Sequence, residues 1–89
     1  MLIVKSFEIK NKLGLHARAA AKIVNTSGQY AARIFLERDG VEVNGKSILG
    51  ILGLACPRGS FISVRAEGAD AADAMEALGK LMDDKFGED

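Results

Sequence analysis

The 89-residue chain has very little cysteine, histidine and aromatic residue, and each shortage excludes a class of protein. Cys56 is the only cysteine, so no internal disulfide can form, and we expect its thiol to be buried as a small apolar group. One cysteine and one histidine are too few for any familiar zinc site. With no Trp, one Tyr and equal numbers of acidic and basic side chains, the chain lacks a nucleic-acid surface. We expect no metal, no cofactor and no nucleic-acid partner.

Long apolar runs are missing as well. No run approaches the about eighteen residues needed to cross a bilayer, and residues 1–10 lack the parts of a secretion signal. The sequence therefore predicts a cytoplasmic protein without membrane insertion. A chain of this length builds one compact core, so we expect a single domain over residues 1–89, and a monomer.

The hydrophobic pattern predicts seven elements. Apolar and polar residues alternate in four segments, which predicts strands at residues 2–9, 33–37, 41–44 and 61–67. Asp39-Gly40 fits a two-residue hairpin turn between the second and third strands. Helical spacing predicts helices at residues 15–27, 47–54 and 71–82, with Gly28 as a left-handed C-terminal residue and Asp70 as a cap.

This order indicates an α+β fold. A sheet of alternating polarity has one apolar face to cover, so we expect an open-faced β-sandwich in which three helices cover one face of a four-stranded antiparallel sheet. A ferredoxin-like split βαβ fold has nearly the same order. Only the short helix and the terminal helix distinguish the two folds.

His16, the only histidine, lies where the first loop becomes the first helix, and Arg18 follows within the first turn. The first N–H groups of a helix lack intrahelical acceptors and the helix dipole is positive there, so the position favours an anion. A neutral imidazole can attack phosphorus, and the backbone N–H groups of Ala17 and Arg18 with the Arg18 guanidinium can stabilise the transferred group. Gly14 allows a close backbone approach. Taken alone, a histidine near a helix start is more often a solvated or loosely capping side chain.

A second segment, residues 46–52 (KSILGIL), predicts an exposed apolar turn. Ser47 fits the cap of a short helix. Successive helix residues are about 100 degrees apart, so the four apolar residues cannot all point inward. We expect some of them to form a partner-docking surface, and the candidates are Ile48, Leu49, Ile51 and Leu52.

Over essentially its full length the chain resembles HPr, the histidine-containing phosphocarrier family of the bacterial phosphotransferase system. The resemblance rests on residues 14–18 (GLHAR), on residues 46–52, on Gly59, and on residues 68–70 (GAD) before an alanine-rich helix. The family's fold is the open-faced sandwich described above.

The resemblance implies a phosphocarrier of sugar uptake that is not an enzyme with its own turnover. His16 would accept a phosphoryl group on Nδ1 from Enzyme I, which phosphoenolpyruvate charges, and pass it to EIIA domains. Arg18 would steady the phosphate. Ser47 matches a regulatory serine that HPr kinase/phosphorylase modifies in some bacteria, and Ile48, Leu49 and Leu52 match the docking surface.

The chain departs from the family at two places. Ala19 replaces the usual proline, which adds an N–H to the first turn, and residues 53–55 (GLA) differ from the family's usual order. Three alternatives stay open: a phosphocarrier of the nitrogen-regulatory branch, a binding module that acts through Ser47 alone, and an acyl-phosphate hydrolase on the ferredoxin-like fold. The hydrolase needs an arginine in a phosphate-cradling loop and an asparagine for water, and Asn11 and Asn25 lack matching spacing.

Overall fold

The computed structural model describes residues 1–88 and contains four strands and three α-helices in that range. A short 3₁₀ turn, η1, follows the last helix. In chain order the elements are β1 (Leu2–Glu8), α1 (Ala17–Ser27), β2 (Arg33–Arg38), β3 (Val41–Asn44), α2 (Ile48–Gly53), β4 (Phe61–Glu67), α3 (Ala71–Asp83) and η1 (Lys85–Gly87).

The four strands form one antiparallel sheet in the order β1-β4-β2-β3. The central strand β4 pairs Ser63 with Ser6 on one side and Val64 with Leu36 on the other. The predicted hairpin is confirmed, because β2 ends at Arg38 and β3 begins at Val41. Both residues of the turn between them have positive φ, as a type I′ turn requires.

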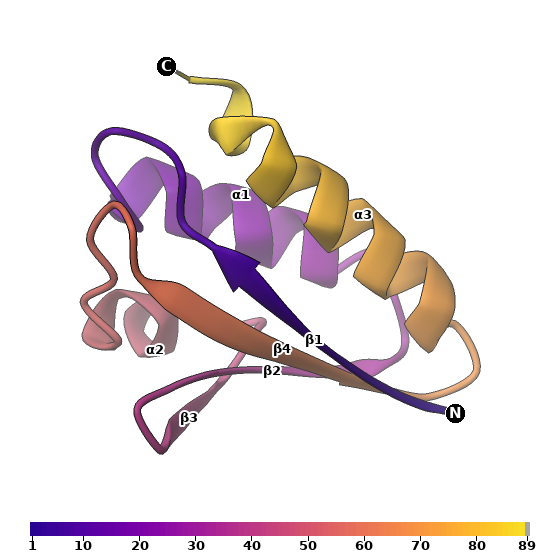
Figure 1. Ribbon diagram of the computed structural model, residues 1–89. Helices are drawn as coiled ribbons and strands as arrows, with labels where there is room; N and C mark the ends of the chain where they lie inside the picture. The colour runs from indigo at the N-terminus through magenta and orange to yellow at the C-terminus, as the bar shows by residue number, and fades with distance from the viewer. Residues whose placement is uncertain (89) are drawn as a thin grey trace.

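The helices and the sheet form two layers, with α1 and α3 packed together over one face of the sheet (Figure 1). The core lies between the layers and contains alternate residues of the central strands, among them Ile34, Leu36, Ile62 and Val64. The presence of both α2 and α3 favours the open-faced sandwich over the ferredoxin-like alternative, and the predicted fold class is confirmed.

The opposite face of the sheet carries charged side chains. The Arg65 guanidinium donates to the carboxylates of Glu42 and Glu67, each at 2.8 Å. It also lies over the ring of Phe35, 4.2 Å from the ring centre, as in a cation–π contact. This face is therefore suited to exposure to solvent, in agreement with an open-faced sheet.

The first helix ends at Ser27 and the last begins at Ala71, as predicted, but the roles predicted for Gly28 and Asp70 are wrong. Gly28 follows α1 in a right-handed conformation, with φ of −66°, so the chain needs no left-handed residue there. Asp70 precedes α3, but its side chain makes no capping bond. Its carboxylate instead accepts hydrogen bonds from the N–H groups of Ala31 and Ala32, each at 2.8 Å, and fixes the loop before β2. Because the N–H groups of this loop occupy the Asp70 carboxylate, the side chain does not cap α3.

The Cys56 thiol is buried, as predicted, and burial raises its pKa. Within residues 1–88, no helix is both long and apolar enough to cross a membrane.

Candidate functional site

The loop before α1 is held against the loop before β4. The N–H of Leu15 donates to the carbonyl oxygen of Cys56 at 2.9 Å. Gly14 has φ of +70°, and a Cβ atom built there would lie 2.4 Å from the same oxygen. Only glycine fits this position without displacing the backbone. Gly14 therefore allows the close approach that orients the next two residues.

His16 is the N-cap residue of α1, as predicted. Its backbone is extended, with φ of −79° and ψ of 177°, while its carbonyl accepts the first helical hydrogen bond, from Ala20 at 2.9 Å. Its side chain folds back so that Nδ1 accepts the N–H of Arg18 at 3.2 Å. Nδ1 therefore lies at the positive end of the α1 dipole, next to backbone N–H groups without acceptors in the helix.

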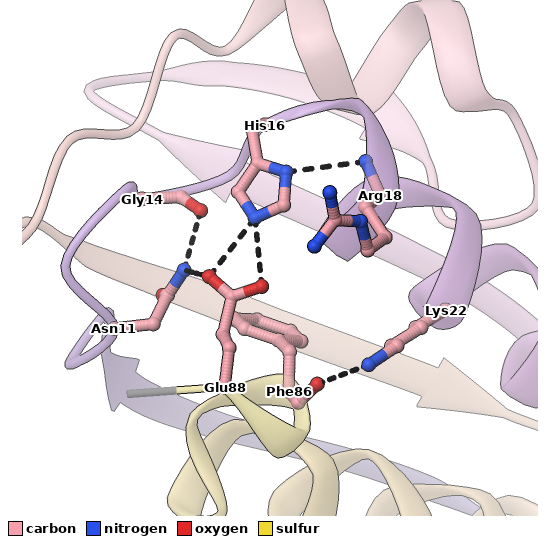
Figure 2. Close-up of polar contacts among 7 residues, drawn as sticks. All are labelled: Asn11, Gly14, His16, Arg18, Lys22, Phe86 and Glu88. Atoms are coloured by element: carbon pink, nitrogen blue, oxygen red, sulfur yellow. Dashed lines mark hydrogen bonds and ion pairs between the residues drawn. The ribbon is translucent and has the colours of Figure 1, made fainter.

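The other ring nitrogen of His16 faces a carboxylate from the far end of the chain. Both oxygens of Glu88 lie 2.9 Å from Nε2, although the two residues are 72 positions apart (Figure 2). The His16 side chain is 23 % exposed and that of Glu88 is 17 % exposed, so the pair is mostly removed from water. The imidazole is held at both nitrogens.

Asn11 completes this network from beneath the loop. The residue is fully buried, and its Nδ2 donates to the Gly14 carbonyl oxygen at 2.7 Å and to Glu88 Oε1 at 2.8 Å. Two acceptors on one side fix the orientation of the amide, which leaves Oδ1 without a hydrogen-bond partner. The hydrogen bonds from Asn11 and then from His16 lower the pKa of the Glu88 carboxyl below its ordinary value.

A tight left-handed turn brings Glu88 to this position. Lys85, Phe86 and Gly87 have φ of 55°, 58° and 75°. For the two residues that are not glycine this conformation costs about 1–2 kcal/mol each. Burial of the Phe86 ring offsets part of that cost, and Lys22 on α1 donates a hydrogen bond from Nζ to the Phe86 carbonyl oxygen (Figure 2). We call residues 85–88 the tail turn.

Beside the imidazole lies an open hollow of about 290 Å³, lined by Lys12, Leu13, Arg18 and Glu88. The Arg18 guanidinium lies next to the His16 ring in Figure 2. The Arg18 guanidinium and the first N–H groups of α1 thus lie on the Nδ1 side of the ring, an environment that favours an anion. Within residues 1–88, no group of three acidic, histidine or cysteine side chains is arranged to hold a metal ion.

The second predicted site lies on α2. Ser47 is the N-cap residue, as predicted, and its Oγ accepts the N–H of Gly50 at 3.1 Å. Leu49 is 83 % exposed and Ile48 is 41 % exposed, whereas Leu52 is half-buried. Ile51 is fully buried in the core, so the prediction that it belongs to a docking surface is wrong. Ile51 is the residue of α2 whose side chain faces the core.

Comparisons with known proteins agree with this arrangement. The family described as "PTS HPr component phosphorylation site" matches residues 3–84. The chain belongs to the HPr family. Phosphocarrier protein HPr of Neisseria meningitidis is 44% identical over 87 residues, which cover 98% of each chain. HPr-like protein Crh of Halalkalibacterium halodurans is 46% identical over 77 residues, 86% of this chain and 92% of that protein.

Among solved structures, HPr-C-His from Thermoanaerobacter tengcongensis superposes with a TM-score of 0.94 at 44% identity, covering 98% of each chain. These likenesses confirm both the predicted family and the open-faced sandwich. HPr proteins are phosphocarriers of the phosphotransferase system, and His16, Arg18 and Ser47 all lie inside the residues that the family matches. The tail turn lies beyond them.

Proposed function

We propose that the chain is a phosphocarrier that accepts a phosphoryl group on Nδ1 of His16 from phosphorylated Enzyme I and passes it to EIIA domains. Enzyme I would itself be charged by phosphoenolpyruvate. One observation carries the proposal: Nδ1 lies at the start of α1 within reach of the Arg18 N–H, while Nε2 is occupied by Glu88.

The hydrogen bonds support Nδ1 as the nucleophile. The Arg18 N–H can donate to Nδ1 only if that atom carries a lone pair, so the ring proton resides on Nε2, where the Glu88 oxygens accept it. An unprotonated Nδ1 attacks phosphorus without a separate base. His16 thus has a geometry suited to one reaction, at one of its two nitrogens.

The surroundings of Nδ1 would stabilise the phosphorylated form. The N–H groups of Ala17 and Arg18 begin α1, and the Arg18 guanidinium lies beside the ring. Each can donate a charge-assisted hydrogen bond to phosphate oxygens. Because the group leaves again for an acceptor, the protein acts as a carrier and has no turnover of its own.

The test is phosphoryl transfer from phosphoenolpyruvate through purified Enzyme I. We expect one acid-labile, alkali-stable phosphoryl group per wild-type chain, none on His16→Ala, and slower acceptance by Arg18→Ala. Lys80→Ala is the matched control, because Lys80 is exposed on α3 and contacts only Glu76 among the ion pairs of residues 1–88. A stable adduct on His16→Ala would contradict the proposal.

The acceptor distinguishes sugar uptake from nitrogen regulation. Ile48 and Leu49 present an exposed apolar surface on α2, which fits docking of protein partners. Incubation of the phosphorylated chain with a panel of EIIA domains would show which branch receives the group. Preferential transfer to sugar-specific EIIA domains supports the first branch, and transfer only to the nitrogen-related type supports the second.

A regulatory function through Ser47 is the second candidate, supported by a capping serine beside exposed Ile48 and Leu49 and by the related protein Crh. We expect HPr kinase and ATP to modify wild-type protein but not Ser47→Ala. An unmodified wild type would exclude this regulation. If phosphoryl transfer to His16 also fails, a binding module that acts through the Ser47 surface becomes the better description.

A further inference from the structure

Several features of the fold hold Glu88 against His16, and the left-handed turn among them costs free energy. A left-handed turn containing two residues other than glycine, a buried phenylalanine ring and the Lys22 hydrogen bond all fix the tail turn. Asn11 then orients the carboxylate from the opposite side.

We propose that Glu88 is a positioning residue for phosphoryl transfer: its carboxylate keeps the ring proton on Nε2 and offsets the positive charge that the imidazole gains when Nδ1 is phosphorylated. This inference rests on the proposed function and deepens it. Glu88 acts through His16, since its oxygens contact Nε2 and not the nitrogen that bonds to phosphorus.

The contacts allow the ring proton to stay on Nε2 throughout the transfer step. The Nδ1 lone pair forms a bond to phosphorus while the bond from phosphorus to the donor breaks, and that electron pair leaves with the donor. The proton stays on Nε2, so the ring becomes a phosphorylated imidazolium paired with the Glu88 carboxylate. When the group moves on to an acceptor, the electron pair returns to Nδ1 and the ring is neutral again. Glu88 neither gains nor loses a proton.

The neighbourhood supports a charged Glu88. Its carboxyl is 17 % exposed, accepts hydrogen bonds from Asn11 and His16, and shares the open hollow with Lys12 and Arg18. Asn11, His16 and Arg18 lower the pKa of the Glu88 carboxyl, so it remains a carboxylate at neutral pH. A hydrogen bond to a charged acceptor is roughly twice as strong as one between neutral groups, so a neutral amide at position 88 would hold Nε2 more weakly.

The test combines kinetics with the spectrum of the ring. With Enzyme I in catalytic amounts, we expect Glu88→Gln to lower the kcat for phosphorylation about tenfold and to leave KM unchanged, because the α2 docking surface is untouched. Glu88→Asp should recover part of the loss. Glu76→Gln is the matched control: it neutralises an exposed glutamate of α3 whose ion-pair partner is Lys80.

The ring nitrogens report the tautomer directly. In ¹⁵N-histidine-labelled wild-type protein with the ring neutral, we expect one protonated nitrogen, Nε2, with a downfield proton slow to exchange with water. Glu88→Ala should mix the tautomers and speed that exchange at least fivefold, while backbone amide spectra confirm the fold. An unchanged kcat in Glu88→Gln, or an unchanged ring spectrum in Glu88→Ala, would overturn the inference.

The two proposals fail in different ways. If the wild-type chain accepts no phosphoryl group from Enzyme I, the proposed function is wrong, and the ring spectra alone then decide whether Glu88 holds the tautomer. If the wild type accepts the group and Glu88→Gln does so at the same rate, only the role of Glu88 is wrong.

Discussion

Lys22 donates a hydrogen bond from its ammonium group to the backbone carbonyl oxygen of Phe86, and this bond ties the tail turn to the helix that carries His16. Lys22 lies one helical turn after Arg18. The first turn of α1 therefore carries His16 and Arg18, and the next turn holds the tail turn through Lys22. The bond makes the position of Glu88 depend on the position of α1.

Replacing Lys22 by methionine should loosen the tail turn while keeping most of the apolar stem. A hydrogen bond from a charged donor is worth about 1.5–3 kcal/mol, and we expect its loss to speed amide exchange at Gly87 and Glu88 about tenfold. Those two amides bond to the carbonyl groups of Asp84 and Lys85 inside the turn. Lys80→Met is the control, and equal exchange rates in both variants would disprove the coupling.

The lowered pKa of Glu88 makes part of the stability depend on pH. Its ordinary value is 4.5 and its folded value is lower, so the folded state favours the carboxylate. The stabilising contribution is complete above about pH 4.5 and is lost as pH falls through the lower, folded value. Urea unfolding should therefore show wild type exceeding Glu88→Gln in stability at pH 7, with the difference shrinking toward pH 3. A constant difference would contradict this linkage.

Gly14→Ala should destabilise the chain by about 3 kcal/mol. The new Cβ would lie 2.4 Å from the Cys56 oxygen, and φ is positive at this position, so steric overlap and backbone strain add. Gly53→Ala is the matched control, because no heavy atom lies within 4 Å of a Cβ there. We expect that change to stabilise by about 0.5 kcal/mol. Similar urea midpoints for the two variants would show that the Gly14 contact is unimportant.

Ser47 is an N-cap whether or not a kinase modifies it. Ser47→Ala removes the acceptor for the Gly50 N–H and should lower the free energy of unfolding by about 1 kcal/mol. Ser47→Asp keeps a cap acceptor and adds negative charge at a helix start, so its stability should stay near that of wild type. Thermal unfolding of the three proteins checks the order. If aspartate destabilises as much as alanine, the cap contributes little.

Local patterns in the sequence predict the elements of the fold well. The hairpin at Asp39-Gly40, the cap at Ser47 and the N-cap position of His16 each depend on a few neighbouring residues, and all three are confirmed. The predicted capping role of Asp70 is wrong because a distant loop competes for its carboxylate, and the predicted left-handed Gly28 is instead right-handed. Asp70 reaches a loop 38 residues earlier in the chain, which its position before a helix cannot reveal.

The residues of the candidate site also differ in whether the local sequence predicts them. His16 and Arg18 could be found because both belong to one helix start. Glu88 could not, because its position depends on three consecutive left-handed residues that include Lys85 and Phe86, side chains that seldom adopt this conformation. The sequence offers Asn11 only as a partner for water in a hydrolase, whereas in the structure its amide orients Glu88.

The contact between His16 and Glu88 also has a consequence for biosynthesis. A chain emerging from the ribosome presents His16 and the start of α1 early, but Glu88 follows 72 residues later and reaches the imidazole only after α3 has docked. A partly made or partly unfolded chain therefore carries the imidazole without this carboxylate. The role proposed for Glu88 would then begin only when the last helix is in place.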